Sequence, residues 1–211
     1  MSATGALRLY LIADTGLVPA ERLPTVVAAA LRGGVSCVQL RAKDHSTAAQ
    51  VALARELRAV CTRAGVPFIV NDRVDVALAA GADGVHVGHL GQEDLDPADA
   101  RRLLGPERWI GVSVAGAAEA AAAAARGASY VSAGPMFATA TKRDAGPAAG
   151  TALLAEVRRA TDLPLVAIGG IRPEHAAALY AAGADGLAVG AAILLADDPA
   201  RAAGAFAAAV A

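Results

Sequence analysis

Short apolar runs recur along the chain, and each is followed by a longer stretch of helical composition. Apolar runs of about four to eight residues are typical of buried strands, and intervening stretches of roughly 10–15 residues are typical of helices. The pattern predicts strands at Leu9–Ala13, Cys37–Leu40, Phe68–Val70, Gly84–Val87, Trp109–Val112, Tyr130–Ala133, Leu165–Ile168 and Gly186–Val189. Helices are expected between the strands and after the last one.

A repeated glycine phrase marks the boundaries between these elements. The segments 80–85, 126–131 and 182–187 each place a glycine where a helical stretch ends and an apolar run begins. Glycine suits the left-handed conformation that often ends a helix. Pro24 marks the start of a helix over Thr25–Arg32, and the alanines of Ala117–Ala125 favour a helix as well. Strands that alternate with helices in this way predict a parallel sheet.

About eight strand–helix units in 211 residues predict a closed (β/α)8 barrel, the TIM-barrel fold, as a single domain over residues 1–211. A doubly wound open sheet is the structural alternative. It usually has fewer strands, and no GxGxxG motif follows the first strand here. We see no domain linker, and we expect the first few residues to be frayed.

Composition excludes several classes of function. The net charge of −1 and the 3% aromatic content argue against a bulk nucleic-acid binder. No apolar run resembles a membrane span, and the N-terminus lacks the pattern of a signal peptide, so a cytoplasmic protein is expected. Cys37 and Cys61 lie in apolar runs without metal-ligand spacing, which indicates buried free thiols. A homo-oligomer stays open.

In such barrels the chemistry lies at the C-terminal ends of the strands. After the second strand, alternation places Gln39, Arg41 and Lys43 on one side of the chain, which is a pattern for recognising an anion. The alternative is a solvated strand end. Ser113 follows the fifth strand, but no nucleophile motif surrounds it.

Carboxylates follow the third and fourth strands. Asn71 and Asp72 come after one, Asp94 comes after the other, and both carboxylates would reach the same mouth. A few carboxylates together with substrate phosphate oxygens usually hold Mg²⁺. The alternatives are that Asp72 is the N-cap of the helix beginning near Val74 and that Asp94 is a turn residue. His86, inside a strand, is more typical of a packed barrel residue than of a ligand.

A long loop follows the sixth strand and carries Thr139, Thr141 and Lys142, whose hydroxyls and ammonium group suit an oxyanion. A solvated surface connection is the alternative. Gly169-Gly170 and Gly190-Ala191 follow the seventh and eighth strands, before helices, as in the usual phosphate site of these barrels. Two anionic subsites predict phosphorylated small-molecule substrates and a group transfer in which pyrophosphate leaves. No nucleophile–base pair is evident, so a covalent enzyme intermediate is not required.

From about Leu9 to Pro199 the chain resembles a known family, thiamine-phosphate synthase. The resemblance rests on Gln-Leu-Arg-x-Lys (39–43), Asn-Asp (71–72), Gly-Val-His-Val-Gly with Gln-Glu-Asp (to Asp94), Gly-Val-Ser (to Ser113), Gly-Pro-x-Phe-x-Thr-x-Thr-Lys (134–142) and Ile-Gly-Gly-Ile (168–171). It implies a (β/α)8 barrel that joins hydroxymethylpyrimidine pyrophosphate to a thiazole phosphate with Mg²⁺. The expected products are thiamine phosphate and pyrophosphate.

The resemblance also implies roles for individual residues. The pyrimidine pyrophosphate would be bound by Gln39, Arg41, Lys43, Asn71, Ser113 and Lys142, of which Arg41, Lys43 and Lys142 would be catalytic. Mg²⁺ would be bound by Asp72 and Asp94. The thiazole phosphate would be bound by Thr139, Ala140, Thr141, Gly170, Gly190 and Ala191.

Two departures from the family pattern concern these roles. His89-Leu90-Gly91 is inserted before Gln92, which bears on the position of Asp94, and Ala191 stands where the family often has serine. Two other functions stay open. One is the related thiazole tautomerase, which does not need the pyrophosphate and metal set, and the other is a non-catalytic binder of a phosphorylated ligand. Mg²⁺-dependent binding of pyrophosphate would distinguish the synthase from both.

Overall fold

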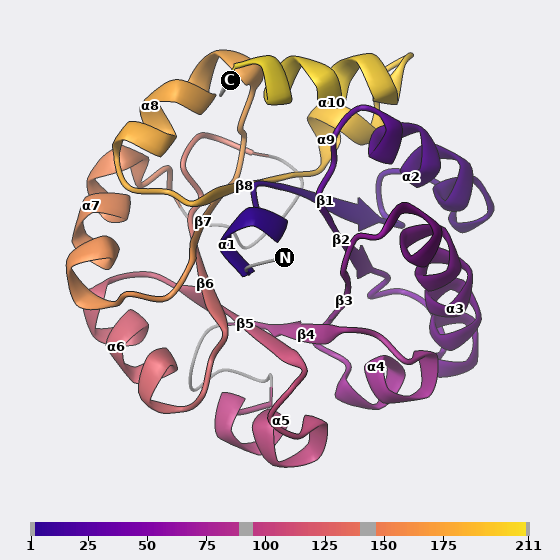
Figure 1. Ribbon diagram of the computed structural model, residues 1–211, viewed down its shortest axis with the longest axis horizontal. Helices are drawn as coiled ribbons and strands as arrows, with labels where there is room; N and C mark the ends of the chain where they lie inside the picture. The colour runs from indigo at the N-terminus through magenta and orange to yellow at the C-terminus, as the bar shows by residue number, and fades with distance from the viewer. Residues whose placement is uncertain (1–2, 89–94, 140–146, 210–211) are drawn as a thin grey trace.

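The computed structural model describes residues 3–88, 95–139 and 147–209, which form a closed barrel of parallel strands surrounded by helices (Figure 1). Each strand pairs with the next one in the sequence, and the last pairs with the first to close the barrel. The predicted (β/α)8 barrel is therefore confirmed, and the alternative of an open sheet is wrong.

The strands begin where the apolar pattern placed them. They are β1 (Leu9–Asp14), β2 (Cys37–Arg41), β3 (Phe68–Asn71), β4 (Gly84–Val87), β5 (Trp109–Val114), β6 (Tyr130–Ala133), β7 (Leu165–Ile168) and β8 (Gly186–Val189). Four of them run one or two residues further than predicted, and Asp14, Arg41 and Asn71 are among the added residues. Backbone hydrogen bonds continue the ladder irrespective of side-chain polarity, so the apolar pattern underestimates these ends.

The helices fill the connections between strands. They are α1 (Ala3–Ala6), α2 (Leu23–Arg32), α3 (Thr47–Ala64), α4 (Val74–Ala80), α5 (Pro97–Leu104), α6 (Ala117–Ala125), α7 (Gly150–Ala160), α8 (Ala176–Ala181), α9 (Ala191–Leu194) and α10 (Pro199–Ala208), with short 3-10 turns η1 (Ala20–Arg22) and η2 (Pro173–His175). The predicted helices over Thr25–Arg32 and Ala117–Ala125 are confirmed. Within the described residues, no helix combines the length and the apolar character needed to cross a membrane.

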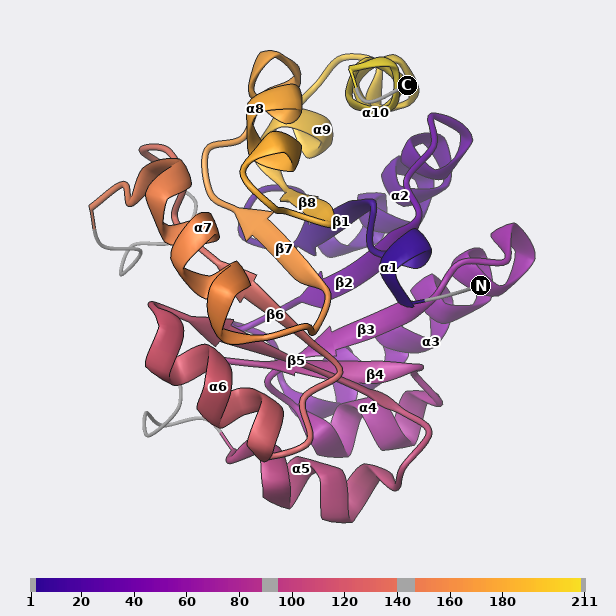
Figure 2. The same ribbon diagram turned by 60° about the vertical axis from the view of Figure 1, so that its left-hand side comes forward.

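Side chains on the strands alternate between the barrel interior and the surrounding helices. Leu11, Val38 and Val112 belong to a large outer cluster that packs against the helices. Tyr10 and Ile69 belong to a smaller cluster inside the barrel. Both faces of the sheet are therefore buried, as expected for parallel strands covered by helices. Figure 2, from another side, shows the tilted strands with the helices outside them.

One end of the barrel is covered by the N-terminal segment. Helix α1 lies across the centre of the barrel in Figure 1, and the Leu7 side chain that follows it is completely buried in the interior cluster. The expectation of a frayed N-terminus is therefore wrong for residues 3–6. Burial of an apolar side chain such as Leu7 contributes about 1.5–3 kcal/mol, which offsets part of the entropy lost when this segment is ordered.

Candidate active site

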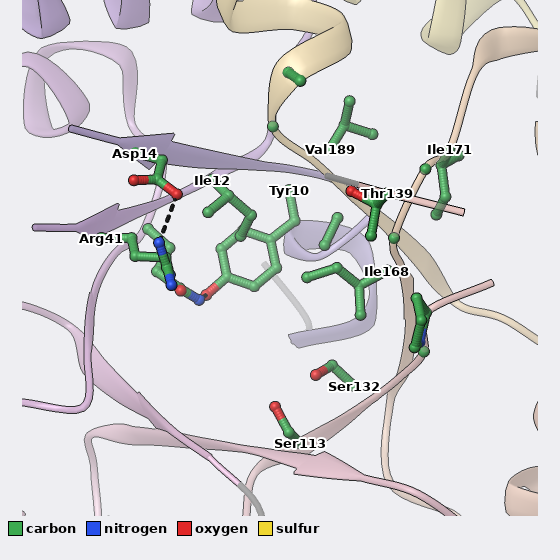
Figure 3. A pocket seen from close by; sticks show the side chains of 18 of the residues that line it. Tyr10, Ile12, Asp14, Arg41, Ser113, Ser132, Thr139, Ile168, Ile171 and Val189 are labelled. Carbon is green, nitrogen blue, oxygen red and sulfur yellow. Dashed lines mark hydrogen bonds and ion pairs between the residues drawn. The ribbon is translucent and has the colours of Figure 1, made fainter. Parts of the chain in front are cut away.

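A cavity of about 640 Å³ opens at the C-terminal ends of the strands, and residues of all eight strands line it. Figure 3 shows side chains from β1, β2, β5, β6, β7 and β8 converging on this space. Every predicted site residue that the structure describes lies in its lining. These residues are Gln39, Arg41, Lys43, Asn71, Asp72, Ser113, Thr139, Gly170, Gly190 and Ala191. The predicted residues Asp94, Ala140, Thr141 and Lys142 lie outside the described residues.

The predicted cations at the end of β2 are each paired with a carboxylate. Arg41 Nη1 donates to Asp14 Oδ2 over 2.8 Å, and Figure 3 marks this bond. Lys43 Nζ lies 3.2 Å from Asp72 Oδ2. Asp14 is only 3% exposed, so its pairing with Arg41 is largely shielded from water. The shielded pair with Asp14 therefore holds Arg41 in place at the cavity, whereas the Lys43 side chain is half exposed.

Asp14 was not among the predicted site residues, although a signal was available. It directly follows the apolar run of the first strand, and the register pairs it with Arg41 on β2. Its Oδ1 also accepts the N–H of Gly16 over 2.9 Å, which fixes the carboxylate. A charged residue at the C-terminal end of a barrel strand is a site candidate by position alone.

The backbone of Asp72 is held in an uncommon conformation. Its φ of +59° lies in the left-handed region, where no other non-glycine residue of the described chain is found. Its N–H donates to the carbonyl of His86 over 2.8 Å, which ties it to β4. Helix α4 begins at Val74 with Arg73 in the N-cap position, so the alternative of Asp72 as N-cap is wrong. Such conformations cluster at functional sites.

The loop after β6 is fastened to the end of β7. The N–H groups of Met136 and Phe137 donate to the carbonyls of Ile168 and Gly169, over 2.9 Å and 3.0 Å. The Phe137 ring also stacks on His175 of η2, with centroids 3.8 Å apart. These contacts bring Thr139 to the same side of the cavity as the glycines that follow β7.

Gly170 has no room for a side chain. Its φ is +63°, and a Cβ atom there would lie 2.6 Å from the carbonyl oxygen of Ala138. Gly190 directly precedes α9, and residues 190–192 line the same cavity as Gly170. The first N–H groups of a helix have no acceptor within it, so they are free to bind an anion. Thr139, Gly170 and the Gly190-Ala191 backbone therefore form one side of the cavity suited to a phosphate group.

A hydrogen-bonded chain of side chains crosses the barrel beneath these groups. Gln39 Nε2 donates to Tyr10 Oη over 2.7 Å, and Tyr10 Oη lies 2.8 Å from Tyr130 Oη. The next link joins Tyr130 Oη to His86 Nδ1 over 3.1 Å. His86 Nε2 then contacts the hydroxyls of two serines, at 3.1 Å for Ser113 and 3.3 Å for Ser132.

The hydrogen-bonded chain gives several residues a place that was not predicted. His86 is packed inside the barrel, as predicted, and it also lines the cavity. Tyr10 and Ser132 line the cavity too, and neither was predicted as a site residue. Burial raises the pKa of Tyr10 and of Tyr130 well above the ordinary value, so both remain neutral hydroxyls. Tyr10 lies two and four residues before Ile12 and Asp14, so alternation along β1 was the available signal.

Comparisons with known proteins agree with this geometry. Residues 9–193 match the model of a protein family described as thiamine monophosphate synthase. The chain is 52% identical over 204 residues to a thiamine-phosphate synthase of Xanthobacter autotrophicus, covering 97% of this chain and 95% of the relative. A similar protein of Roseiflexus castenholzii is 50% identical over 192 residues, covering 90% and 82% of the two chains.

A solved structure supports the same assignment. The thiamine phosphate pyrophosphorylase of Pyrococcus furiosus superposes with a TM-score of 0.88 at 35% sequence identity, covering 98% of this chain and 96% of that one. A 3-hexulose-6-phosphate synthase superposes with a TM-score of 0.72 at 24% identity, which shows a shared fold alone. With the family match spanning most of the chain and close relatives aligned over nearly its full length, this chain belongs to the thiamine monophosphate synthase family.

Proposed function

We propose that this chain is a transferase of thiamine biosynthesis that makes thiamine phosphate. It joins 4-amino-2-methyl-5-(diphosphooxymethyl)pyrimidine to 4-methyl-5-(2-phosphooxyethyl)thiazole and releases pyrophosphate. The observation that carries this proposal is one cavity that combines two paired cations on one side with a glycine-lined wall on the other. Relatives that are about half identical in sequence bear the name of this activity.

The pyrimidine pyrophosphate fits the β2 and β3 side of the cavity. Arg41 and Lys43 supply positive charge there, and Asn71 supplies an amide at the end of the neighbouring strand. Arginine suits two-point contact with a phosphate oxygen pair, whereas lysine acts as a point charge. Gln39 and Ser113 lie deeper and would hold the pyrimidine ring. We assign Lys142 to the leaving pyrophosphate on the sequence motif alone.

The residues at the mouth fit a hard cation. Asp72 offers carboxylate oxygens and Asn71 an amide oxygen, which are the ligand types that Mg²⁺ prefers. Among the described residues no group of three or more acidic, histidine or cysteine side chains gathers at one point, so substrate phosphate oxygens would complete the coordination. We propose that Asp72, with Asp94, holds Mg²⁺ on the pyrophosphate. Bound there, the ion would stabilise charge on the leaving group.

The acceptor phosphate fits the opposite side of the same mouth. Thr139, Gly170 and the backbone of Gly190 and Ala191 would hold it, with Ala140 and Thr141 continuing the same loop. In the proposed reaction the bond from the pyrimidine methylene carbon to the pyrophosphate oxygen breaks first. The electron pair leaves with pyrophosphate, and the thiazole nitrogen then donates its lone pair to the resulting carbocation. Arg41, Lys43 and Lys142 would stabilise the growing negative charge on the departing oxygens.

The thiazole tautomerase is the competing function. That reaction has one phosphorylated substrate and no pyrophosphate, so it does not need the cationic side of the cavity. Arg41 and Lys43 are present here, each held by a carboxylate. Retention of this arrangement favours the synthase.

The decisive experiment measures pyrophosphate release from the pyrimidine substrate, with and without the thiazole phosphate, in Mg²⁺ and in chelator. We expect release only when the acceptor and Mg²⁺ are both present, and thiamine phosphate should form in equal amount. A folded protein that releases no pyrophosphate under any condition would contradict the proposal. The tautomerase substrate would then be tested on the same preparation.

A further inference from the structure

The donor at Gln39 sets one direction for the whole hydrogen-bonded chain inside the barrel. Gln39 Nε2 is a donor to Tyr10, so the Tyr10 hydroxyl hydrogen has one acceptor left among the described residues, Tyr130 Oη. Tyr130 has thereby accepted one hydrogen, and its own hydrogen can go only to His86 Nδ1. His86 Nδ1 is therefore the acceptor, which places the ring hydrogen on Nε2. A protonated ring would leave the Tyr130 hydrogen without an acceptor.

The direction continues to the serines at the other end. His86 Nε2–H is shared between Ser113 Oγ and Ser132 Oγ. Both hydroxyls therefore accept from histidine, and neither finds an acceptor for its own hydrogen within the described part of the chain. At the opposite end, Gln39 has turned its amide nitrogen toward Tyr10, so its carbonyl oxygen is the group left for a ligand. The cavity thus presents an acceptor at Gln39 and donors at Ser113 and Ser132.

The surrounding packing keeps this arrangement in place. Tyr10 and Tyr130 are completely buried, so water does not compete for their hydroxyls. Gly111 leaves the space in which Tyr130 and His86 meet, because a Cβ atom there would overlap the Tyr130 ring and His86 Nδ1. Reversing one member would leave an unsatisfied buried group unless every other member reversed too. The orientations of Gln39 and Ser113, at the two ends of the hydrogen-bonded chain, are therefore coupled, although no described contact joins them directly.

We propose that Tyr10, Tyr130 and His86 are positioning residues that make the cavity select an aminopyrimidine over its oxo counterpart. This inference rests on the proposed synthase function and specifies how its donor site recognises the ring. An amino group donates to the Gln39 carbonyl, and a ring nitrogen with a free lone pair accepts from Ser113. In the 4-oxo analogue the amino group becomes a carbonyl and the adjacent ring nitrogen gains a hydrogen, so a donor is replaced by an acceptor facing Gln39.

The test compares kcat/KM for the aminopyrimidine pyrophosphate and for its 4-oxo analogue, each with the thiazole phosphate in Mg²⁺. For the unmodified protein we expect a preference of about 10⁴-fold for the amino substrate, as in sites that hydrogen-bond a polar substrate group. Tyr130→Phe removes the central link, so Gln39 can rotate and His86 can change tautomer. The preference should fall by about tenfold or more, through a loss with the amino substrate and a gain, or no loss, with the oxo analogue.

Tyr180→Phe is the matched control. It removes a tyrosine hydroxyl that donates to the carbonyl of Arg8 over 2.7 Å and that does not line the cavity. Its preference should equal that of the unmodified protein. If Tyr130→Phe does not fold, Tyr10→Phe interrupts the chain one link earlier and should show the same loss of selectivity.

The outcomes separate this proposal from the synthase assignment. An unmodified protein that makes thiamine phosphate confirms the synthase whatever the variants do. If Tyr130→Phe and Tyr10→Phe lower kcat/KM equally for both substrates, the hydroxyls are merely structural and the proposal is overturned. It is also overturned if the unmodified protein accepts the amino and oxo substrates equally well. No activity with either substrate would count against the synthase assignment itself.

Discussion

Asp14 illustrates how a single buried charge prepares the cavity for an anion. Its carboxylate is almost fully buried and binds both Arg41 and the Gly16 N–H. Removing either partner of a buried ion pair lowers the stability of the protein by several kcal/mol, because the remaining charge is left unpaired. The pair therefore holds the guanidinium at one place, so the proposed pyrophosphate substrate would not have to order a flexible side chain.

Asp14→Asn should weaken binding of the pyrophosphate substrate while largely preserving shape. We expect KM for that substrate to rise about tenfold, and the free energy of unfolding to fall by about 1–3 kcal/mol, because a charged hydrogen bond becomes a neutral one. Steady-state kinetics and denaturant unfolding measure the two effects. Asp185→Asn is the control. Asp185 forms a 3.0 Å ion pair with Arg158, and neither residue lines the cavity. It should lose stability and keep KM, and a parallel rise in KM would refute a specific role for Asp14.

Asp72→Asn should separate metal binding from backbone geometry. Asparagine tolerates the left-handed conformation that Asp72 adopts, so the substitution removes charge without adding strain. We expect the Mg²⁺ concentration for half-maximal activity to rise at least about tenfold, consistent with loss of a charged ligand. Calorimetry of pyrophosphate binding in Mg²⁺ supplies a readout besides turnover. Asp75→Asn, which alters an exposed pair with Arg73, is the control and should leave both values unchanged.

Lys142 lies outside the described residues, so its role rests on its motif. Lys142→Ala should lower kcat, because the activation free energy rises by about 2–4 kcal/mol when a positioned charge that stabilises the transition state is removed. Circular dichroism should show an intact fold. Lys142→Arg retains the charge and should recover part of the lost rate. Normal turnover in Lys142→Ala would remove this lysine from the site.

At the level of elements, the connection between β6 and β7 organises the acceptor side of the cavity. Two backbone hydrogen bonds and the Phe137–His175 stack join segments about thirty residues apart in the chain. Gly169 and Gly170 allow the close approach, since either Cβ atom would meet the β6 loop at less than 3 Å. The paired glycines therefore position a neighbouring loop, besides lining the cavity themselves.

Gly170→Ala should disturb the acceptor side of the cavity. Its positive φ alone costs alanine about 1–2 kcal/mol, and the clash with Ala138 displaces the loop that carries Thr139. We expect KM for the thiazole phosphate to rise about tenfold, whereas KM for the pyrimidine substrate should change less. Gly65→Ala is the control, because Gly65 has a φ of +69° and a methyl group added there would meet nothing within 4 Å. It should lose similar stability and keep both KM values.

The sequence predicted the elements better than it predicted the contacts between them. Apolar runs and glycine stops located every strand, since these are local signals that parallel strands require. The polar ends of β1, β2 and β3 were underestimated because side-chain polarity does not report backbone pairing. Helix α1 was missed because a four-residue helix has almost no periodicity and depends on burial of Leu7.

The site was predictable only where its residues follow strand ends. Arg41, Lys43 and Asp72 lie at strand ends or just beyond them, and all of them line the cavity. The tyrosine–histidine chain was not found, because Tyr10 and Tyr130 are 120 residues apart and meet only after the barrel closes. The sequence indicated a buried His86 without indicating its partners. Long-range pairing of this kind depends on strand register, which single-sequence patterns do not define.

For the molecule as a whole, burial of both cysteines makes stability depend on alkaline pH. Burial raises the pKa of Cys61 to about 12 and raises that of Cys37 as well. Above pH of about 8.5 the unfolded chain releases thiol protons that the folded chain retains. The contribution of the thiols to the free energy of unfolding is therefore fully present below that pH and is lost as pH rises toward 12, by up to about 1.4 kcal/mol per pH unit for each thiol.

Cys61→Val should reduce this dependence. Valine is apolar and similar in size, and it cannot ionise. Denaturant unfolding between about pH 8 and pH 10.5 should show a shallower decline for the variant than for the unmodified protein. Equal slopes would show that Cys61 does not contribute to the alkaline loss of stability.

The covered end of the barrel also constrains the order of events during turnover. Leu7, Ile69 and Val166 are completely buried in the interior cluster, so the barrel interior is filled there, whereas the cavity opens at the C-terminal ends of the strands. Exposure rises along β2 and just beyond it, from 4% at Gln39 to 23% for the Arg41 side chain and 49% for that of Lys43. If the pyrimidine is held at Gln39 as proposed, it lies deeper than its own pyrophosphate, and we expect it to bind before the thiazole phosphate. In that arrangement the pyrophosphate lies nearest the mouth of the cavity, and we expect it to leave before the joined product.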